Sequence, residues 1–295
     1  MRKIFSLQSP WFGSSWWAVL PAIILMGFFL IIPAGLGLLS TFTNYSPGQA
    51  DWKIVGLLNY QKVFENRTLN SAFTNGVLLT VLTVPVEIAL ALLVAALLRQ
   101  PFRGRSFVRV LLLLPWLVSP MAAGVMWHFL FNGQVGLSAW LGSLFTSDYI
   151  ASPLANPGWA LPTLALTEVW RVAPLTAFLL LPGVLAVPQD QLDYALLIGS
   201  SSWTKWSRII LPQMRGLTLT IIFLLVGESL SEFDSVLILT GGGPGTRTIT
   251  PALYSYNLAV TSHNWSSGVT IAWLLEGVVL IAGIFYITLI RSEGR

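Results

Sequence analysis

The chain has 295 residues, of which 55% are hydrophobic and 9% are charged, whereas a soluble domain carries about 25% charged residues. Most of the surface therefore does not face water. Because no polar stretch is long enough for a second domain, the sequence predicts a single transmembrane domain over residues 1–295. The lack of cysteine excludes disulfides and thiolate metal sites. The net charge of +4 comes from basic residues at the ends of apolar segments. This distribution indicates membrane topology and no nucleic-acid partner.

Six apolar stretches are each long enough to cross the roughly 30 Å hydrocarbon core of a bilayer, which takes about 20 helical residues. Such segments must be helical, because a helix satisfies its own backbone hydrogen bonds. The first stretch is too long for a cleavable signal peptide and is expected to stay as an anchor. The sequence therefore predicts an all-α polytopic membrane protein with six transmembrane helices at 16–42, 75–98, 108–131, 159–187, 217–239 and 268–290.

Basic residues distinguish the two sides of this predicted protein. The ends of the chain and two short loops carry Arg2, Lys3, Arg99, Arg103, Arg105, Arg109, Lys205, Arg208, Arg215, Arg291 and Arg295. The longer loops on the opposite side carry Lys53, Lys62, Arg67 and Arg247. Because cytoplasmic loops are enriched in Lys and Arg, both termini are expected in the cytoplasm.

The outside loop at 240–267 opens with the run Gly241-Gly242-Gly243-Pro244-Gly245. The run lacks the Gly-Lys-Ser/Thr of a phosphate-binding loop, so we interpret it as a turn. With two histidines and no cysteine, the chain offers neither a metal site nor a catalytic nucleophile cluster. We therefore expect a protein that is not an enzyme and holds no cofactor of its own.

The cytoplasmic segment 188–215 is polar yet patterned. Apolar residues recur at helical spacing from Leu192, Gly199 is a natural helix end, and Pro212 stops a second short helix. The segment is predicted to form two short amphipathic helices joined at a bend. From pattern alone, it could lie on lipid as an interfacial helix or dock on a partner protein.

This segment also carries a motif. It reads D-Y-A-x-x-x-G from Asp193 to Gly199, followed after nine residues by I-I-L-P at 209–212. The pattern resembles the E-A-A-x-x-x-G and I-x-L-P motif of binding-protein-dependent ABC permeases. Tyr194 departs from the motif's first Ala, and Ile198 stands where carbohydrate permeases usually place Asp.

Three weaker matches flank the motif in the family's order. They are Gly56-Leu57-x-Asn59-Tyr60, then Val169-Trp170 with Pro174, and Thr240 to Pro244 followed by Leu253-Tyr254. The chain is thus similar over most of its length to permeases of the carbohydrate (maltose- and glycerol-phosphate-like) class. The resemblance implies the fold of an ABC type I importer permease in a bacterial or archaeal cytoplasmic membrane.

The resemblance also implies partners. In that family the cytoplasmic loop docks as a coupling helix on an ATPase subunit, so the ATP and Mg would be bound by a partner. The complex would contain a second permease subunit, two copies of a cytoplasmic ATPase and an extracytoplasmic solute-binding protein. The expected ATPase-coupling residues are Leu192, Asp193, Ala195, Leu196 and Gly199.

Ionisable residues inside membrane spans are costly and are candidates for function. By position, the resemblance places the sugar pathway at Trp170, Arg171, Ser229 and Glu232, with Glu228 sharing the helix face of Glu232. Arg171 could instead neutralise Glu168 or Glu228 to hold the helices together. Glu87 and Glu276 are expected to pack or hydrogen-bond between helices, and His128 to lie near the membrane interface.

Other functions fit parts of the pattern. A permease of the same family could import a polyamine, an amino acid or glycerol phosphate, since acids in span five suit a cation and Arg171 suits a phosphate. An ion-coupled secondary transporter would also contain intramembrane acids, but the sequence shows no internal repeat, and this class leaves segment 188–215 unexplained.

Overall fold

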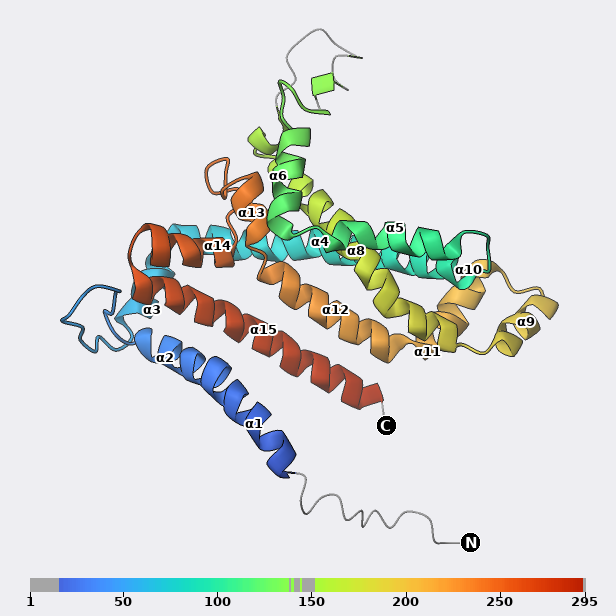
Figure 1. Cartoon of the computed structure of the whole chain (residues 1–295), viewed down its shortest axis with the longest axis horizontal. Helices are drawn as coiled ribbons and strands as arrows, with labels where there is room; N and C mark the ends of the chain where they lie inside the picture. Colours follow the sequence, from blue (N-terminus) through green and yellow to red (C-terminus); the bar gives the residue numbers. More distant parts are fainter. Residues whose placement is uncertain (1–15, 138, 141–143, 145–151, 294–295) are drawn as a thin grey trace.

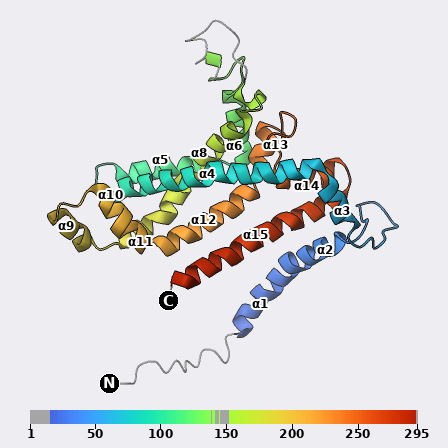
Figure 2. The same cartoon turned by 180° about the vertical axis from the view of Figure 1, so that it is seen from behind.

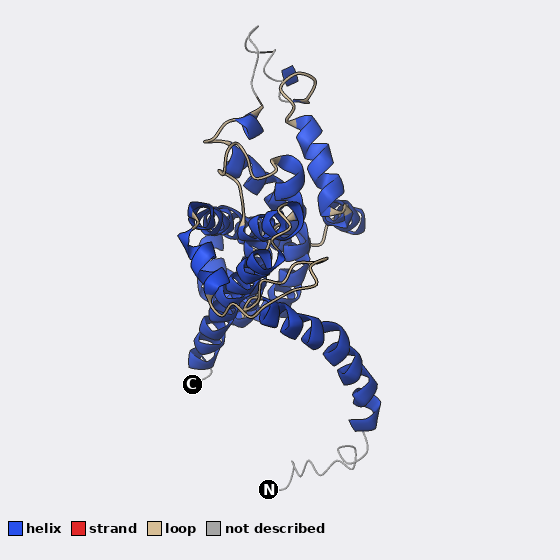
Figure 3. Ribbon diagram, turned by 90° about the vertical axis from the view of Figure 1, so that its left-hand side faces the viewer, coloured by secondary structure: helices blue, strands red, loops and turns tan. Residues whose placement is uncertain are grey.

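The computed structural model describes residues 16–137, 139–140, 144 and 152–293, which fold almost entirely into helices (Figure 1, Figure 3). In the described residues the β-structure consists of one isolated antiparallel bridge between Thr43 and Ile54. The first half of the chain forms α1 (Trp16–Met26), η2 (Gly27–Ile31), α2 (Ile32–Ser40), α3 (Leu58–Glu65), α4 (Arg67–Arg99), α5 (Arg105–Leu117), α6 (Pro120–Leu130) and η3 (Pro153–Ala155). The second half forms α8 (Ala160–Ala186), α9 (Gln189–Leu197), α10 (Ser202–Lys205), η4 (Trp206–Ile210), α11 (Leu211–Gln213), α12 (Arg215–Leu230), α13 (Asp234–Leu239), α14 (Pro251–Tyr256), η5 (Asn257–Thr261) and α15 (Trp265–Glu293).

Four of the six predicted spans are continuous helices. These helices are each long and apolar enough to cross a bilayer, and they run over Val19–Ser40, Arg67–Arg99, Ala160–Ala186 and Trp265–Arg291. The described chain reaches six spans if each of two bent helix pairs is counted as one. The all-helical fold, with four to six candidate spans in the described residues, is therefore confirmed. The second span begins earlier than predicted, at Arg67, where the side chain of Asn66 caps the helix.

The predicted third span is not a straight helix. Its two parts, α5 and α6, meet at 90°, and α6 stands away from the bundle in Figure 1. Pro120 disfavours helical backbone at the residue before it, so Ser119 adopts φ −59° and ψ 145° and uses its hydroxyl to cap α6. The Ser-Pro pair is visible in the sequence, and a break there was predictable.

The predicted fifth span is also interrupted. α12 ends at Leu230, and a short break separates it from α13, which begins at Asp234. At its other end, the chain bends by 78° near Met214, where α11 gives way to α12. The break places Glu232 outside regular helix, between α12 and α13.

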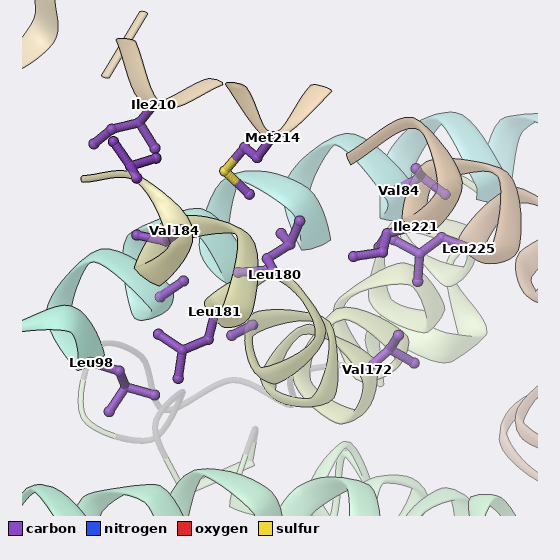
Figure 4. Packing of buried hydrophobic residues seen from close by; sticks show 14 of the residues in the cluster. Val84, Leu98, Val172, Leu180, Leu181, Val184, Ile210, Met214, Ile221 and Leu225 are labelled. Carbon is purple, nitrogen blue, oxygen red and sulfur yellow. The ribbon is translucent and has the colours of Figure 1, made fainter. Parts of the chain in front are cut away.

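α8 is the central helix of the bundle. Half of the residues in the most apolar 18-residue stretch of α8 are buried within the chain, compared with a third of those in the same kind of stretch of α4 and none in the first span. α4 and α8 pack against each other and α12 packs against both; Figure 2 shows α12 running below α4. Figure 4 shows the core cluster, to which α8 contributes Leu180 and Val184, α12 contributes Ile221 and Leu225, and α4 contributes Leu98.

The two ends of the bundle differ. The α4–α5 connection and α9 to α11 lie together at one end, and the last turn of α15 points to the same side (Figure 1). α3 and α14 lie at the opposite end (Figure 1). Arg99, Arg103, Lys205, Arg208 and Arg291 thus gather on one side, as the charge pattern predicts, whereas Arg2, Lys3 and Arg295 lie outside the described residues.

Candidate functional site

A small cavity lies where α4, α8 and α12 meet. Its volume is about 10 Å³, room for about one water molecule. The polar side chains that line it carry carboxyl or hydroxyl groups. The lining residues are Thr83, Glu87, Glu168, Val172, Leu225, Glu228, Ser229 and Glu232. The three helices thus bring together side chains that are up to about 150 positions apart in the sequence.

Arg171 holds three of these carboxyl groups. Its Nη2 lies 2.8 Å from Glu168 Oε2, 3.4 Å from Glu228 Oε1 and 3.7 Å from Glu232 Oε2. The side chains of Arg171 and Glu168 are both more than nine-tenths buried, whereas that of Glu228 is 48% exposed. Burial strengthens such pairs but costs the hydration of each ion, so the cluster is held by mutual neutralisation.

Glu232 is fixed by the break between α12 and α13. Its Oε1 accepts a hydrogen bond from the backbone N–H of Ser235 at 2.9 Å, as the carboxylate does at a helix N-terminus. Its carbonyl oxygen accepts one from the Thr250 hydroxyl, also at 2.9 Å. The two bonds leave the second carboxyl oxygen directed at Arg171.

Five of the lining residues were not predicted for the site: Thr83, Glu87, Glu168, Val172 and Leu225. Thr83 Oγ1 lies 3.2 Å from Ser229 Oγ and joins α4 to α12. Glu87 is 3% exposed and lines the cavity, but no hydrogen bond or ion pair joins it to another described residue. Of the two roles expected for Glu87, packing or hydrogen bonding between helices, the described residues show the packing. Thr83 and Glu87 are four apart, so their shared helix face could have been read from the sequence.

Trp170 belongs to a different group of side chains. Its ring stands edge-on to Trp127 at 5.4 Å, and Trp127 stacks on Phe131 at 5.1 Å. Trp170 is therefore next to Arg171 in sequence but does not line the cavity, whose residues come from the opposite side of α8. Glu276 is exposed on α15, away from the cluster, and His128 Nδ1 lies 3.2 Å from the carbonyl oxygen of Leu239.

Segment 188–215 forms the two predicted short helices. α9 ends at Leu197, and Gly199 turns the chain with φ +78°, a conformation that costs other residues about 1–2 kcal/mol. The second arm runs through α10, η4 and α11. Arg99 anchors the end of α8, donating to the carbonyl oxygens of Val184 and Val187 at 2.9 and 3.1 Å, and it reaches the segment by donating to Gln189 Oε1 at 3.1 Å.

The structure divides the five residues expected to couple to an ATPase. Leu192 and Ala195 are buried, and Leu192 packs into the core beneath the segment. Asp193 and Gly199 are exposed, and Asp193 accepts a hydrogen bond from Gln189 at 3.0 Å. Leu196 is 55% exposed. A larger apolar surface is free beside it, formed by Tyr194, Leu197, Ile198 and Trp203, which are 64–85% exposed.

A comparison with known protein families identifies the chain. Residues 68–292 match the family described as the binding-protein-dependent transport system inner membrane component. The chain belongs to this family. It is therefore a permease subunit of an ABC importer and a multi-pass protein of a bacterial or archaeal cytoplasmic membrane, not itself an enzyme.

The permease resembles family members that are named for different substrates. It is 29% identical over 245 residues to the trehalose/maltose transport system permease protein MalF of Thermococcus litoralis, covering 81% of both chains. It is 28% identical to the sn-glycerol-3-phosphate transport system permease protein UgpA of Rhizobium meliloti, covering 89% of both.

A solved structure confirms the fold of the permease. A chain of a bacterial ABC transporter involved in the import of the acidic polysaccharide alginate superposes with a TM-score of 0.82, at 19% identity. The match covers 95% of the permease and 96% of that chain. At this identity the likeness concerns the fold, so the predicted importer architecture is confirmed and the solute is left open.

Proposed function

We propose that the permease forms half of the translocation pathway for a sugar or oligosaccharide, which an extracytoplasmic binding protein delivers. The observation that carries the proposal is the polar cavity between α4, α8 and α12, which Glu228, Ser229 and Glu232 line and where Arg171 pairs with both glutamates. Carboxyl, guanidinium and hydroxyl groups are the side chains that recognise sugar hydroxyls. The trehalose/maltose permease among the relatives supports the same class of solute.

We further propose that a second permease subunit completes the pathway and that two cytoplasmic ATPase subunits drive it. The cavity has room for about one water molecule, so a solute must enter in another conformation. A solute can move between two conformations only if its contacts differ between them. ATP binding to the partner ATPases would supply that change through segment 188–215.

The coupling surface follows from the burial pattern. Because Leu192 and Ala195 are already buried in the permease, we propose that they support α9 from beneath. The ATPase would then contact the exposed side, where Leu196, Leu197 and Asp193 are accessible. Gly199 gives the turn that separates the two arms.

The test is to tag the permease in its native host, extract it in mild detergent and identify the proteins that copurify. We expect an ATPase in two copies and a second permease of the same size class. In the assembled complex, candidate sugars presented with the binding protein should then stimulate ATP hydrolysis. Recovery of the chain alone, under conditions that preserve other ABC complexes, would contradict the importer assembly.

A further inference from the structure

The cavity contains more acidic than basic groups. Among the described residues that line it or pair across it, four carboxyl groups face one guanidinium group. Arg171 pairs with Glu168, Glu228 and Glu232 through Nη2 and does not itself line the cavity, so a solute in the cavity meets the carboxyl groups first. Among the described residues, no group of three or more His, Asp or Glu side chains is arranged to hold a metal ion.

Glu87 gives a second, independent observation. Glu87 is 3% exposed as a residue, and the carboxyl group of so buried a glutamate normally has a hydrogen-bond partner, because an unpaired buried polar group is costly. Glu87 has none among the described residues and lines the cavity. Its carboxyl group is therefore available to a group that enters the cavity, and it can accept hydrogen bonds there.

Resting on the proposed function, we propose that this cavity selects the solute by charge: the permease imports an uncharged sugar and excludes anionic ones, such as sugar phosphates and uronates. Hydroxyl groups can donate to the surrounding carboxylates, which are acceptors when ionised. A phosphate or carboxylate group on the solute offers only acceptors and brings like charges together at low dielectric. The family alone does not decide this, since one relative is named for glycerol 3-phosphate.

The absence of cysteine allows a direct measurement of charge in the cavity. We would introduce Ser229→Cys, whose side chain lines the cavity, into the assembled importer with its binding protein and ATP. Two thiol reagents of similar size would be compared, a trimethylammonium methanethiosulfonate and a sulfonate methanethiosulfonate. The readout is the rate of mass increase of this subunit, normalised to each reagent's rate with a free thiol.

We expect the cationic reagent to react at least about tenfold faster than the anionic one, as fields in clefts of one charge sign produce. Glu87→Gln and Glu228→Gln should each lower that ratio about threefold. Glu228 provides the second variant because its half-exposed side chain makes a folding defect less of a concern. Glu276→Gln, on the exposed face of α15, is the matched control and should leave the ratio unchanged.

The two possible failures are distinguishable. If the thiol reacts with both reagents at equal normalised rates, or if neither glutamine variant changes the ratio, the charge selection is wrong and the pathway assignment stands. If the thiol reacts with neither reagent during ATP-driven turnover, the cavity does not lie on the pathway. In that case the proposed substrate site fails, and the charge selection fails with it.

Discussion

Arg171 determines how the buried carboxyl groups can coexist. Its guanidinium contacts Glu168, Glu228 and Glu232 from a single nitrogen, Nη2. Its Nε is buried without a hydrogen-bond partner in the described part of the chain. The residue therefore has two roles that one substitution would affect together, the stability of the bundle and the chemistry of the cavity.

We expect Arg171→Ala to lower the initial rate of uptake more than tenfold while binding-protein affinity stays within about twofold. The reason is that removing one partner of a buried ion pair costs about 3–5 kcal/mol and leaves charge unpaired in the pathway. Uptake and binding-protein affinity would be measured on the same preparation of reconstituted complex. Uptake at the wild-type rate would contradict a role for Arg171 in the pathway.

Asn59 shows why the Gly56 to Tyr60 stretch contains an asparagine. Its Nδ2 donates to the carbonyl oxygens of Thr41 and Thr43, both at 2.7 Å, and so fixes α3 against the end of α2. The amide is 4% exposed, so water cannot replace these bonds. The residue secures the outer end of the first span.

Asn59→Asp keeps the size of the side chain but removes both donors, so it should destabilise the protein by about 1–3 kcal/mol. The midpoint of thermal unfolding of the purified complex measures the effect. Gln61→Ala, at an exposed position on the same helix, serves as the control and should change the midpoint little. Equal midpoints for Asn59→Asp and the wild type would show that the two hydrogen bonds do not hold α3.

At the scale of elements, α9 combines two different surfaces. Leu192 is 8% exposed and Leu197 is 85% exposed, although both are leucines on one nine-residue helix. Leu192→Ala removes buried apolar contacts and should cost about 2–5 kcal/mol. Leu197→Ala should leave the stability of the permease within about 0.5 kcal/mol.

The two variants should therefore separate folding from coupling. Thermal unfolding of the permease is expected to change with Leu192→Ala, and the amount of ATPase retained on the tagged permease is expected to fall with Leu197→Ala. Each variant serves as the control for the other. If Leu197→Ala leaves both ATPase retention and transport unchanged, the exposed side of α9 is not the coupling surface.

The same helix shows how far sequence reasoning reaches. The spacing of Leu192 and Ala195 correctly predicted an amphipathic helix, because a period of 3.6 residues needs only local information. The spacing could not predict whether the apolar face is covered by the same chain or by a partner. The contact between Thr83 and Ser229 was equally out of reach, because it depends on how α4 and α12 pack, 146 positions apart in sequence.

At the scale of the whole molecule, the arrangement predicts which loops share a side of the membrane. Single cysteines in place of Arg103 and Arg247, both exposed, probe the two ends of the bundle. In right-side-out vesicles, a membrane-impermeant thiol reagent should label Arg247→Cys and leave Arg103→Cys unlabelled until the vesicles are opened. Labelling in the reverse order would show that the positive-inside assignment is wrong.

The small cavity has a consequence for the cell that carries this permease. A space that holds about one water molecule cannot hold a file of water, so ions do not cross this cavity in this conformation. If the cavity lies on the pathway, as proposed, protons and small ions meet a closed barrier there. A membrane that stores energy as an ion gradient could then hold many copies of the permease without a leak, and the path would open only when the partner ATPases bind nucleotide.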